Sequence, residues 1–318
     1  MRREGSPWRG LNVVFFRELF DHLTSARMVV MELLVVLLGG VVVVFASEQI
    51  RATTAEDPFL FLRLFVPPGQ SLLSFMLVLS ILVPLISIAL GFDSVNGEYN
   101  RRTMSRILAQ PIYRDALLFG KFLAGLATLS ICLVTLWLLV IGFGLIRLGI
   151  PPNGEELGRM LMFLLVTIAY AGVWLALAML LSILVRSTAT AALIALGLWL
   201  FLALMWPAMA QMIGEAISPS DIRFAQLGLP TPDTLMWQQG LSRLSPGTLY
   251  LESLLALLNP DTQTMTTLLA QFQGRIPSPL PLSESIQQAW PQIVSLIAGT
   301  IVLYVIGYVA FQRQEVRA

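Results

Sequence analysis

The sequence predicts an all-α integral membrane protein with six transmembrane helices, and three observations support this fold class. Of the 318 residues, 56% are hydrophobic and only 12% are charged, and the mean hydropathy is +0.78, unlike a soluble globular domain. Six apolar runs are long enough to cross a bilayer core about 30 Å thick. Basic residues are distributed unevenly between the segments that join these runs, which predicts a fixed orientation in the membrane.

The first 27 residues are expected to form an amphipathic cytoplasmic segment. They hold five arginines, and apolar residues repeat among them at helical spacing. Such a helix lies on the cytoplasmic leaflet, or packs on the bundle or on a partner. The apolar positions are Phe15, Phe16, Leu19, Phe20 and Leu23.

Six spans follow from the apolar runs. Residues 28–46, interrupted only by Glu32, are interpreted as an uncleaved span, because the charged region before them is too long for a signal peptide. Pro84 is expected to kink the second span. Small residues flanking or within the third span, at Gly120, Gly142 and Gly144, favour close helix packing. The spans are predicted at 28–46, 72–92, 122–146, 160–185, 189–206 and 293–311.

Residues 207–292 form the longest non-spanning region and are expected to be an extracytoplasmic helical loop. Ser245-Pro246 predicts the start of a helix that runs to Leu258, and Asn259-Pro260 predicts its end and the start of a second helix, 260–273. The leucines of the first helix give it an apolar face, so it is expected to rest on the outer membrane surface or dip into it.

The distribution of positive charge predicts the topology. Of the 20 basic residues, thirteen fall in the proposed inner segments and seven in the outer ones. Because cytoplasmic loops carry the excess of arginine and lysine, both termini are expected in the cytoplasm. The segment 93–121 is then a cytoplasmic loop, and it contains the only lysine, Lys121.

This polar segment is also expected to contain a helix, residues 95–110. Met104, Ile107 and Leu108 lie on one face at helical spacing, and Pro111 ends the pattern. An amphipathic helix at the cytoplasmic mouth of a bundle is suited to receive force from a motor subunit. A solvated or headgroup-bound helix fits the same pattern, so the residues alone leave both interpretations open.

The same segment resembles the signature of ABC-2 type ABC transporter permeases, which typically show Gly-Glu, a charged pair, Gly-Thr, Pro-[Val/Ile]-x-Arg and Gly-Lys. Asn100 stands where that family often has a second glutamate, and Arg102 where it often has glycine. The resemblance is carried by Gly97-Glu98-Tyr99-Asn100-Arg101-Arg102-Thr103, Ile107-Leu108-Ala109-Gln110-Pro111-Ile112-Tyr113-Arg114 and Gly120-Lys121.

The resemblance implies a permease subunit in a bacterial-type plasma membrane, working as a dimer with itself or a sibling permease. A separate ABC-type ATP-binding subunit would dock on residues 93–121, and export is the expected direction. The expected partners are these subunits and the lipid bilayer, with no nucleic acid. The implied coupling residues are Gly97, Glu98, Arg101, Arg102, Thr103, Met104, Ile107, Leu108, Pro111 and Arg114.

Several catalytic functions are disfavoured by residues that the sequence lacks. Gly120-Lys121 has Asp115 and Phe122 where a P-loop needs glycine and Ser/Thr, so ATP is not expected to bind here. Glu155-Glu156 and Arg159 are similar to part of a CAAX-type membrane protease motif. With His22 as the only histidine, neither such an enzyme nor a Ser-His dyad nor a histidine-rich metal site is expected. Glu155 and Glu156 are instead expected in a solvated outer turn leading the fourth span.

A third alternative is a membrane scaffold or regulatory subunit that transports nothing. Few ionisable residues fall deep inside the spans, so an ion-coupled transporter is disfavoured. An ATP-driven permease is compatible with this pattern, because its energy arrives from the cytoplasmic partner. No cofactor is expected in this chain.

Overall fold

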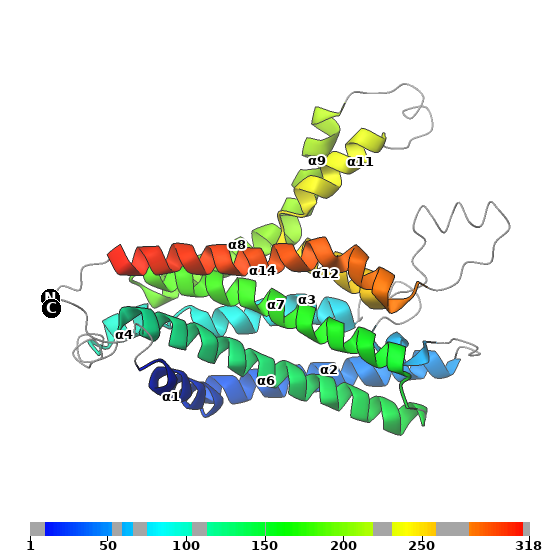
Figure 1. Cartoon of the computed structure of the whole chain (residues 1–318), viewed down its shortest axis with the longest axis horizontal. Helices are drawn as coiled ribbons and strands as arrows, with labels where there is room; N and C mark the ends of the chain where they lie inside the picture. Colours follow the sequence, from blue (N-terminus) through cyan, green and yellow to red (C-terminus); the bar gives the residue numbers. More distant parts are fainter. Residues whose placement is uncertain are drawn as a thin grey trace.

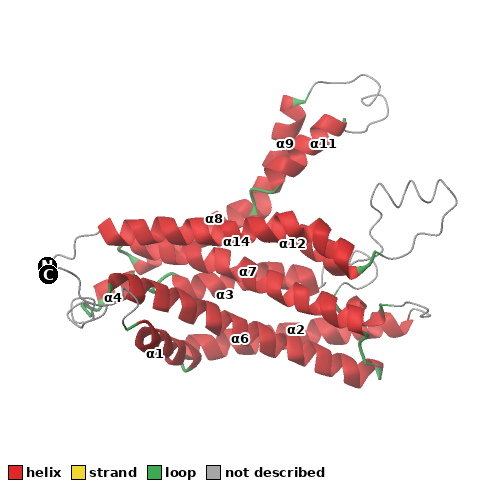
Figure 2. Cartoon of the chain, in the orientation of Figure 1, coloured by secondary structure: helices red, strands yellow, loops and turns green. Residues whose placement is uncertain are grey.

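A computed structural model describes residues 10–52, 59–65, 75–103, 113–149, 151–218, 231–258 and 280–313, and every regular element in these ranges is helical (Figure 2). Element η1 is a 3-10 helix and η2 a π-helical turn; the others are α-helices. In chain order they are α1 (Leu11–Leu23), α2 (Ala26–Ala52), η1 (Leu60–Leu64), α3 (Phe75–Gly91), α4 (Asn96–Asn100), α6 (Arg114–Leu148), α7 (Gly154–Leu184), α8 (Thr188–Leu200), η2 (Phe201–Met205), α9 (Trp206–Ile217), α11 (Pro232–Ser242), α12 (Pro246–Leu258) and α14 (Leu282–Arg313).

The described part of the chain contains six stretches of helix long and apolar enough to cross a membrane, which confirms the predicted fold class. They are Met28–Ala46, Phe75–Asn100, Arg114–Leu148, Gly154–Leu184, Thr188–Ile217 and Leu282–Arg313. The third and sixth helices begin eight and eleven residues before the predicted spans, at Arg114 and Leu282. Apolar length marks the part of a helix inside the lipid, whereas the helix itself continues into the polar layer at each end.

Helix α7 is the centre of the bundle and packs against α3, α6, α12 and α14 (Figure 1). Small residues on α7 allow these neighbours to approach closely: a Cβ atom added to Gly91 of α3 would lie 2.7 Å from the Cβ of Ala178. Between helices in lipid, such packing and interhelical hydrogen bonds provide the stabilisation, because the lipid is as apolar as the side chains. Of the glycines expected to pack closely, Gly120 and Gly144 do so, and Gly142 has no neighbour within 4 Å.

Proline inside α3 leaves a backbone carbonyl without its helical partner. Pro84 has no N–H, so the carbonyl of Ser80, four residues earlier, cannot make its usual bond. The hydroxyl of Tyr170 on α7 donates to this carbonyl at 3.1 Å. The ring of Tyr170 stacks on Tyr250 of α12 at 4.3 Å, and the Tyr250 hydroxyl lies 3.1 Å from Thr167 Oγ1. Helix α12 is therefore part of the packed bundle, joined to α3 through α7.

Helices α9 and α11 pack on each other and project from the bundle (Figure 1). Their base lies at η2, where the N–H of Trp206 bonds the carbonyl of Phe201, five residues earlier. The next donor in this π-helical register would be Pro207, which has none. The Leu202 carbonyl accepts instead from Ser245 Oγ at 2.9 Å, and Trp206 Nε1 donates to the Leu241 carbonyl at 2.8 Å.

A buried charged cluster closes the end of the bundle opposite α4. Glu156 leads α7 as predicted, but the prediction that it is solvated is wrong. It is 4% exposed, forms a capping box with Asn153, and accepts from the Phe61 backbone N–H at 2.9 Å. Phe61 lies 95 residues earlier in the chain, so only the fold brings its N–H to Glu156.

Arg159 is fully buried in the same cluster, although its sequence position placed it in an outer turn. Its guanidinium donates to the Leu257 carbonyl (2.7 Å), Ser285 Oγ (3.0 Å), Glu155 (2.9 Å) and the Leu280 carbonyl. It thereby joins the start of α7 to the end of α12 and the start of α14. The acceptors bond both terminal nitrogens and so offset part of the cost of burying the charge, although Nε has no hydrogen-bond partner among the described residues.

Candidate functional site

The segment after α3 turns sharply at the end of the bundle where α1 and the last residues of α14 also lie (Figure 1). Helix α4 ends at Asn100, and Arg102 follows with a left-handed φ of 56°. The backbone N–H of Thr103 then returns to the Glu98 carbonyl at 3.0 Å, and the Thr103 hydroxyl donates to the same carbonyl at 3.2 Å. This is a Schellman-type helix end.

The predicted helix 95–110 is present over Asn96–Asn100, but the prediction that it is continuous is wrong, because the chain leaves the helix at residue 102. Residues 104–110 lie outside the described ranges. A left-handed residue cannot continue an α-helix, and the position is one that glycine adopts most easily. This observation explains why the signature that the segment resembles often has glycine there.

The predicted coupling residues have different environments. Gly97 and Glu98 are in α4, where Glu98 points inward, while Arg101 and Arg102 are exposed at its end. Arg114 begins α6. Met104, Ile107, Leu108 and Pro111 lie outside the described residues, so the set as a whole stays a prediction.

Helix α4 is held against the turn between α7 and α8. Ser182 Oγ accepts from the backbone N–H groups of Val95 and Asn96 at 3.0 and 3.2 Å. The Asn96 amide donates to the Val185 carbonyl at 3.1 Å, and the Asn100 amide to the Arg186 carbonyl at 3.3 Å. Because these bonds satisfy the start of α4 and the end of α7 together, the two elements form one unit at this end of the bundle.

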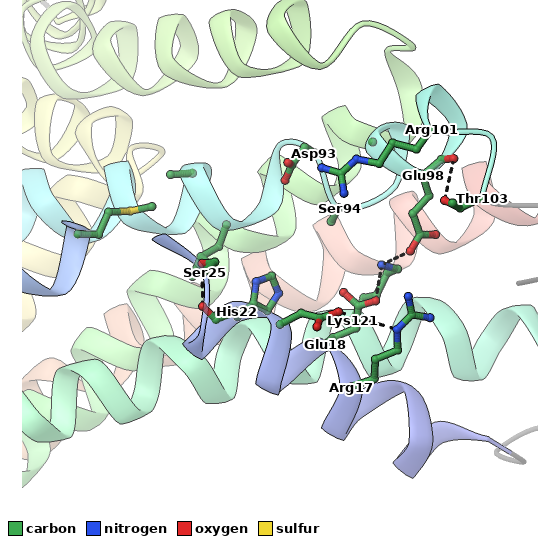
Figure 3. A pocket seen from close by; sticks show the side chains of 15 residues that line it. Arg17, Glu18, His22, Ser25, Asp93, Ser94, Glu98, Arg101, Thr103 and Lys121 are labelled. Carbon is green, nitrogen blue, oxygen red and sulfur yellow. Dashed lines mark hydrogen bonds and ion pairs between the residues drawn. The ribbon is translucent and has the colours of Figure 1, made fainter. Parts of the chain in front are cut away.

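Lys121 connects α4 to α1. It was predicted in a loop, but α6 begins at Arg114 and buries it. Its Nζ lies 2.8 Å from Glu18 Oε1 on α1 and 2.7 Å from Glu98 Oε1 on α4 (Figure 3). The side chains of the lysine and the two glutamates are 5%, 15% and 15% exposed. Glu18 was absent from the predicted site, because it lies 103 residues from Lys121 and no local sequence pattern pairs the two.

These residues line a cleft of about 500 Å³ between α1 and the α3–α4 connection (Figure 3). Arg17, Asp21, Asp93 and Arg101 line it as well, so it holds charges of both signs. His22 also faces it, and burial lowers the pKa of its imidazole below the usual 6.5. His22 is therefore neutral near pH 7.

Asp115, in the first turn of α6, connects this end to α14. Its Oδ1 accepts from the Tyr308 hydroxyl at 3.1 Å and from the Gln312 amide. Helices α1, α4, α6 and α14 are thus joined by polar contacts through the first two turns of α6. The carboxylate also lies near the positive end of the α6 dipole, where negative charge is favoured.

The side chains of this site form ion pairs between helices. Each ionisable side chain of the Lys121 cluster is paired with an opposite charge from another helix, and the nearby His22 is half-buried and neutral near pH 7. Within the described ranges, no three His, Cys, Asp or Glu side chains are grouped to hold a metal ion. Such an arrangement holds α1, α4 and α6 together through ion pairs.

Nearly the whole chain is similar to known proteins. Residues 13–316 match the model of a family described as ABC-2 family transporter protein. The "Probable ABC transporter permease protein NosY" of Pseudomonas aeruginosa is 33% identical over 196 residues, 60% of this chain and 66% of that protein. The protein of the same name from Stutzerimonas stutzeri is 32% identical over 131 residues, 39% of this chain and 45% of that protein. Each match thus spans less than two thirds of the relative.

Proposed function

The chain belongs to the ABC-2 family of transporter proteins, and we propose that this multi-pass permease exports its substrate with energy from a separate ATP-binding subunit docked on residues 93–121. The observation that carries the proposal is the junction at α4. Arg101 and Arg102, directly after this short helix, are exposed, while Glu98 and Asn96 connect the helix to α6 and α7. A partner that moved α4 would therefore move the bundle.

We infer that this end of the bundle is cytoplasmic. The inner segments carry thirteen of the 20 basic residues, and α1, α4 and the end of α14 lie together (Figure 1). Cysteines placed at Ser105 and Gln314 are expected to resist an impermeant thiol reagent in sealed cells, whereas one at Ser278 reacts. Cys132 is replaced by serine beforehand to remove the background. Labelling of Ser105 from outside would reverse the orientation.

The coupling test compares an apolar anchor with a rim charge. Ile107→Asp puts a charge where an anchor would fill a pocket of the ATPase, a change worth about 2 kcal/mol or more. Arg101→Ala removes an exposed charge worth about 0–1 kcal/mol. We expect Ile107→Asp to abolish co-purification of the ATPase or its stimulated hydrolysis, and Arg101→Ala to leave both nearly unchanged.

The controls for this test are complex recovery and the melting temperature of each permease variant. If Ile107→Asp folds, assembles and stimulates hydrolysis normally, residues 93–121 are not the coupling element. The motor would then have to engage α1, through Phe16 or Leu19.

A second permease copy is also part of the proposal. The helix formed by α8, η2 and α9 exposes large apolar side chains, Leu193, Leu204 and Met212 among them, and α9 and α11 project beyond the bundle (Figure 1). A dimer would cover part of this surface. Native mass spectrometry of the purified complex is expected to show two permeases with two ATPases, and a one-to-one complex would contradict the dimer.

A further inference from the structure

Helices α1 and α4 stand on opposite sides of the charged cleft, and one side chain bridges them. Lys121 reaches from α6 and bonds a carboxylate from each helix, Glu18 at 2.8 Å and Glu98 at 2.7 Å (Figure 3). Helix α1 itself packs on α6 and α2. Its ionic connection to α4 therefore passes through the Lys121 ammonium group.

The arrangement of charges makes the ionic connection between α1 and α4 rigid. Two carboxylates share one ammonium group, and all three side chains are at least 85% shielded from solvent. Without Lys121 the two carboxylates would repel each other in a poorly solvated place. The second oxygen of Glu98, Oε2, is buried and has no hydrogen-bond partner among the described residues, so this carboxylate depends on the lysine.

Direct packing between α1 and α6 keeps the lysine in place. A Cβ atom added to Gly120 would lie 2.8 Å from Val14 Cγ1, so α1 and α6 touch directly beside Lys121. On the other side, α4 is bonded to Ser182 and Val185. Displacement of α4 therefore acts on Glu98, Lys121 and Glu18 in turn.

We propose that Lys121 is a positioning residue that makes α1 move together with α4, so that α1 is a second moving element of the interface with the ATPase. This inference rests on the proposed docking of an ATPase on residues 93–121. The lysine touches neither nucleotide nor substrate. It acts by holding two helices at a constant separation while the motor moves one of them.

The first experiment uses the permease alone, in lipid nanodiscs. Spin labels at the exposed positions Val13 and Arg101 report the distance between α1 and the end of α4. We expect Lys121→Arg to keep the single distance of the parent and Lys121→Met to broaden it. An unchanged distance in a folded Lys121→Met variant would overturn the inference.

Lys121 is the only lysine, so an amine-reactive reagent followed by mass spectrometry reports its burial directly. Modification is expected about tenfold slower than at a lysine introduced by Arg17→Lys, because it requires local opening. Glu18→Gln or Glu98→Gln is expected to remove this protection. Protection that survives both substitutions would mean that the carboxylates do not hold the lysine.

The last experiment separates transmission from stability in the complex with the ATPase. The triple variant Glu18→Gln, Lys121→Met, Glu98→Gln removes the three buried charges together. Its melting temperature is expected to equal that of the parent. We expect its stimulated ATP hydrolysis to stay about fivefold or more below the parent, the lower range of coupling between two sites. Full recovery of hydrolysis would show a merely structural role. Failure of the unmodified permease to bind the ATPase would instead contradict the proposed function.

Discussion

Arg102 occupies a backbone conformation that suits glycine better. A left-handed residue with a side chain costs about 1–2 kcal/mol, and glycine avoids this cost although it loses more entropy on folding. Arg102→Gly is therefore expected to raise the stability of the permease by about 1 kcal/mol, measured as a higher melting temperature in detergent. Arg101→Gly is the matched control, because Arg101 has a right-handed φ of −81° and should gain nothing. A lower melting temperature for Arg102→Gly would contradict the expectation.

Tyr170 satisfies the carbonyl that Pro84 leaves free. Tyr170→Phe keeps the stacked ring and removes only the hydroxyl that donates to Ser80, so a loss of about 0.6–1.7 kcal/mol is expected for a hydrogen bond between helices in lipid. Unfolding in sodium dodecyl sulfate measures it. Tyr304→Phe is the control, because its hydroxyl has no hydrogen-bond partner within the described ranges.

The Tyr170 interpretation has a second, more demanding test. In a Pro84→Ala background the backbone supplies its own N–H to the Ser80 carbonyl. Removal of the Tyr170 hydroxyl should then cost less than in the parent. An equal cost in both backgrounds would show that the bond is unrelated to the proline.

At the scale of an element, α1 should be pH-sensitive through His22. Partial burial lowers the pKa of its imidazole, which faces Glu18, Asp21, Asp93 and Lys121. The unfolded chain therefore binds more protons than the folded one as the pH falls below 6.5, and stability falls with it. Above pH 6.5 the imidazole is mostly neutral in the folded and unfolded chains, so His22 no longer lowers the stability.

The measurement compares melting temperatures at pH 7.5 and 5.5 for the parent and His22→Asn. We expect the melting temperature of the parent to fall more between pH 7.5 and 5.5 than that of the variant, because the variant has no imidazole to protonate. The surrounding carboxylates titrate in both proteins and cancel in the comparison. Equal losses would mean that His22 does not set the pH response of this helix.

At the scale of the whole molecule, Arg159 joins the start of α7 to the end of α12 and the start of α14. Arg159→Met leaves the Leu257 and Leu280 carbonyls without their donor and separates the ends of α12 and α14 from α7. The free energy of unfolding is expected to fall by about 3–5 kcal/mol, because one partner of a buried charged cluster is removed. Arg147→Met, which breaks a more exposed pair with Glu48 at 3.7 Å, should cost about 0–1 kcal/mol. Similar losses in thermal unfolding would contradict a special role for the cluster.

Local signals in the sequence predicted the fold class and several element ends. The apolar runs predicted six spans, and Ser245-Pro246 with Asn259-Pro260 predicted the bounds that α12 has, Pro246–Leu258. These signals depend on residues within a few positions of each other, since proline lacks an N–H wherever it occurs. The prediction that one helix continues through Arg102 was wrong, because the apolar periodicity runs through a residue that the chain uses as a left-handed helix end.

The tertiary structure decided where charge is buried. By itself, the sequence determined that the protein is a helical membrane protein with a basic, signature-bearing segment between two spans. It could not determine that Lys121 sits between Glu18 and Glu98, or that Glu156 and Arg159 are buried in the opposite end of the bundle. A charge is stable in a poorly solvated place only where opposite charges and hydrogen-bonding groups surround it. Those partners come from helices up to 126 residues apart in the chain, and only the folded bundle brings them together.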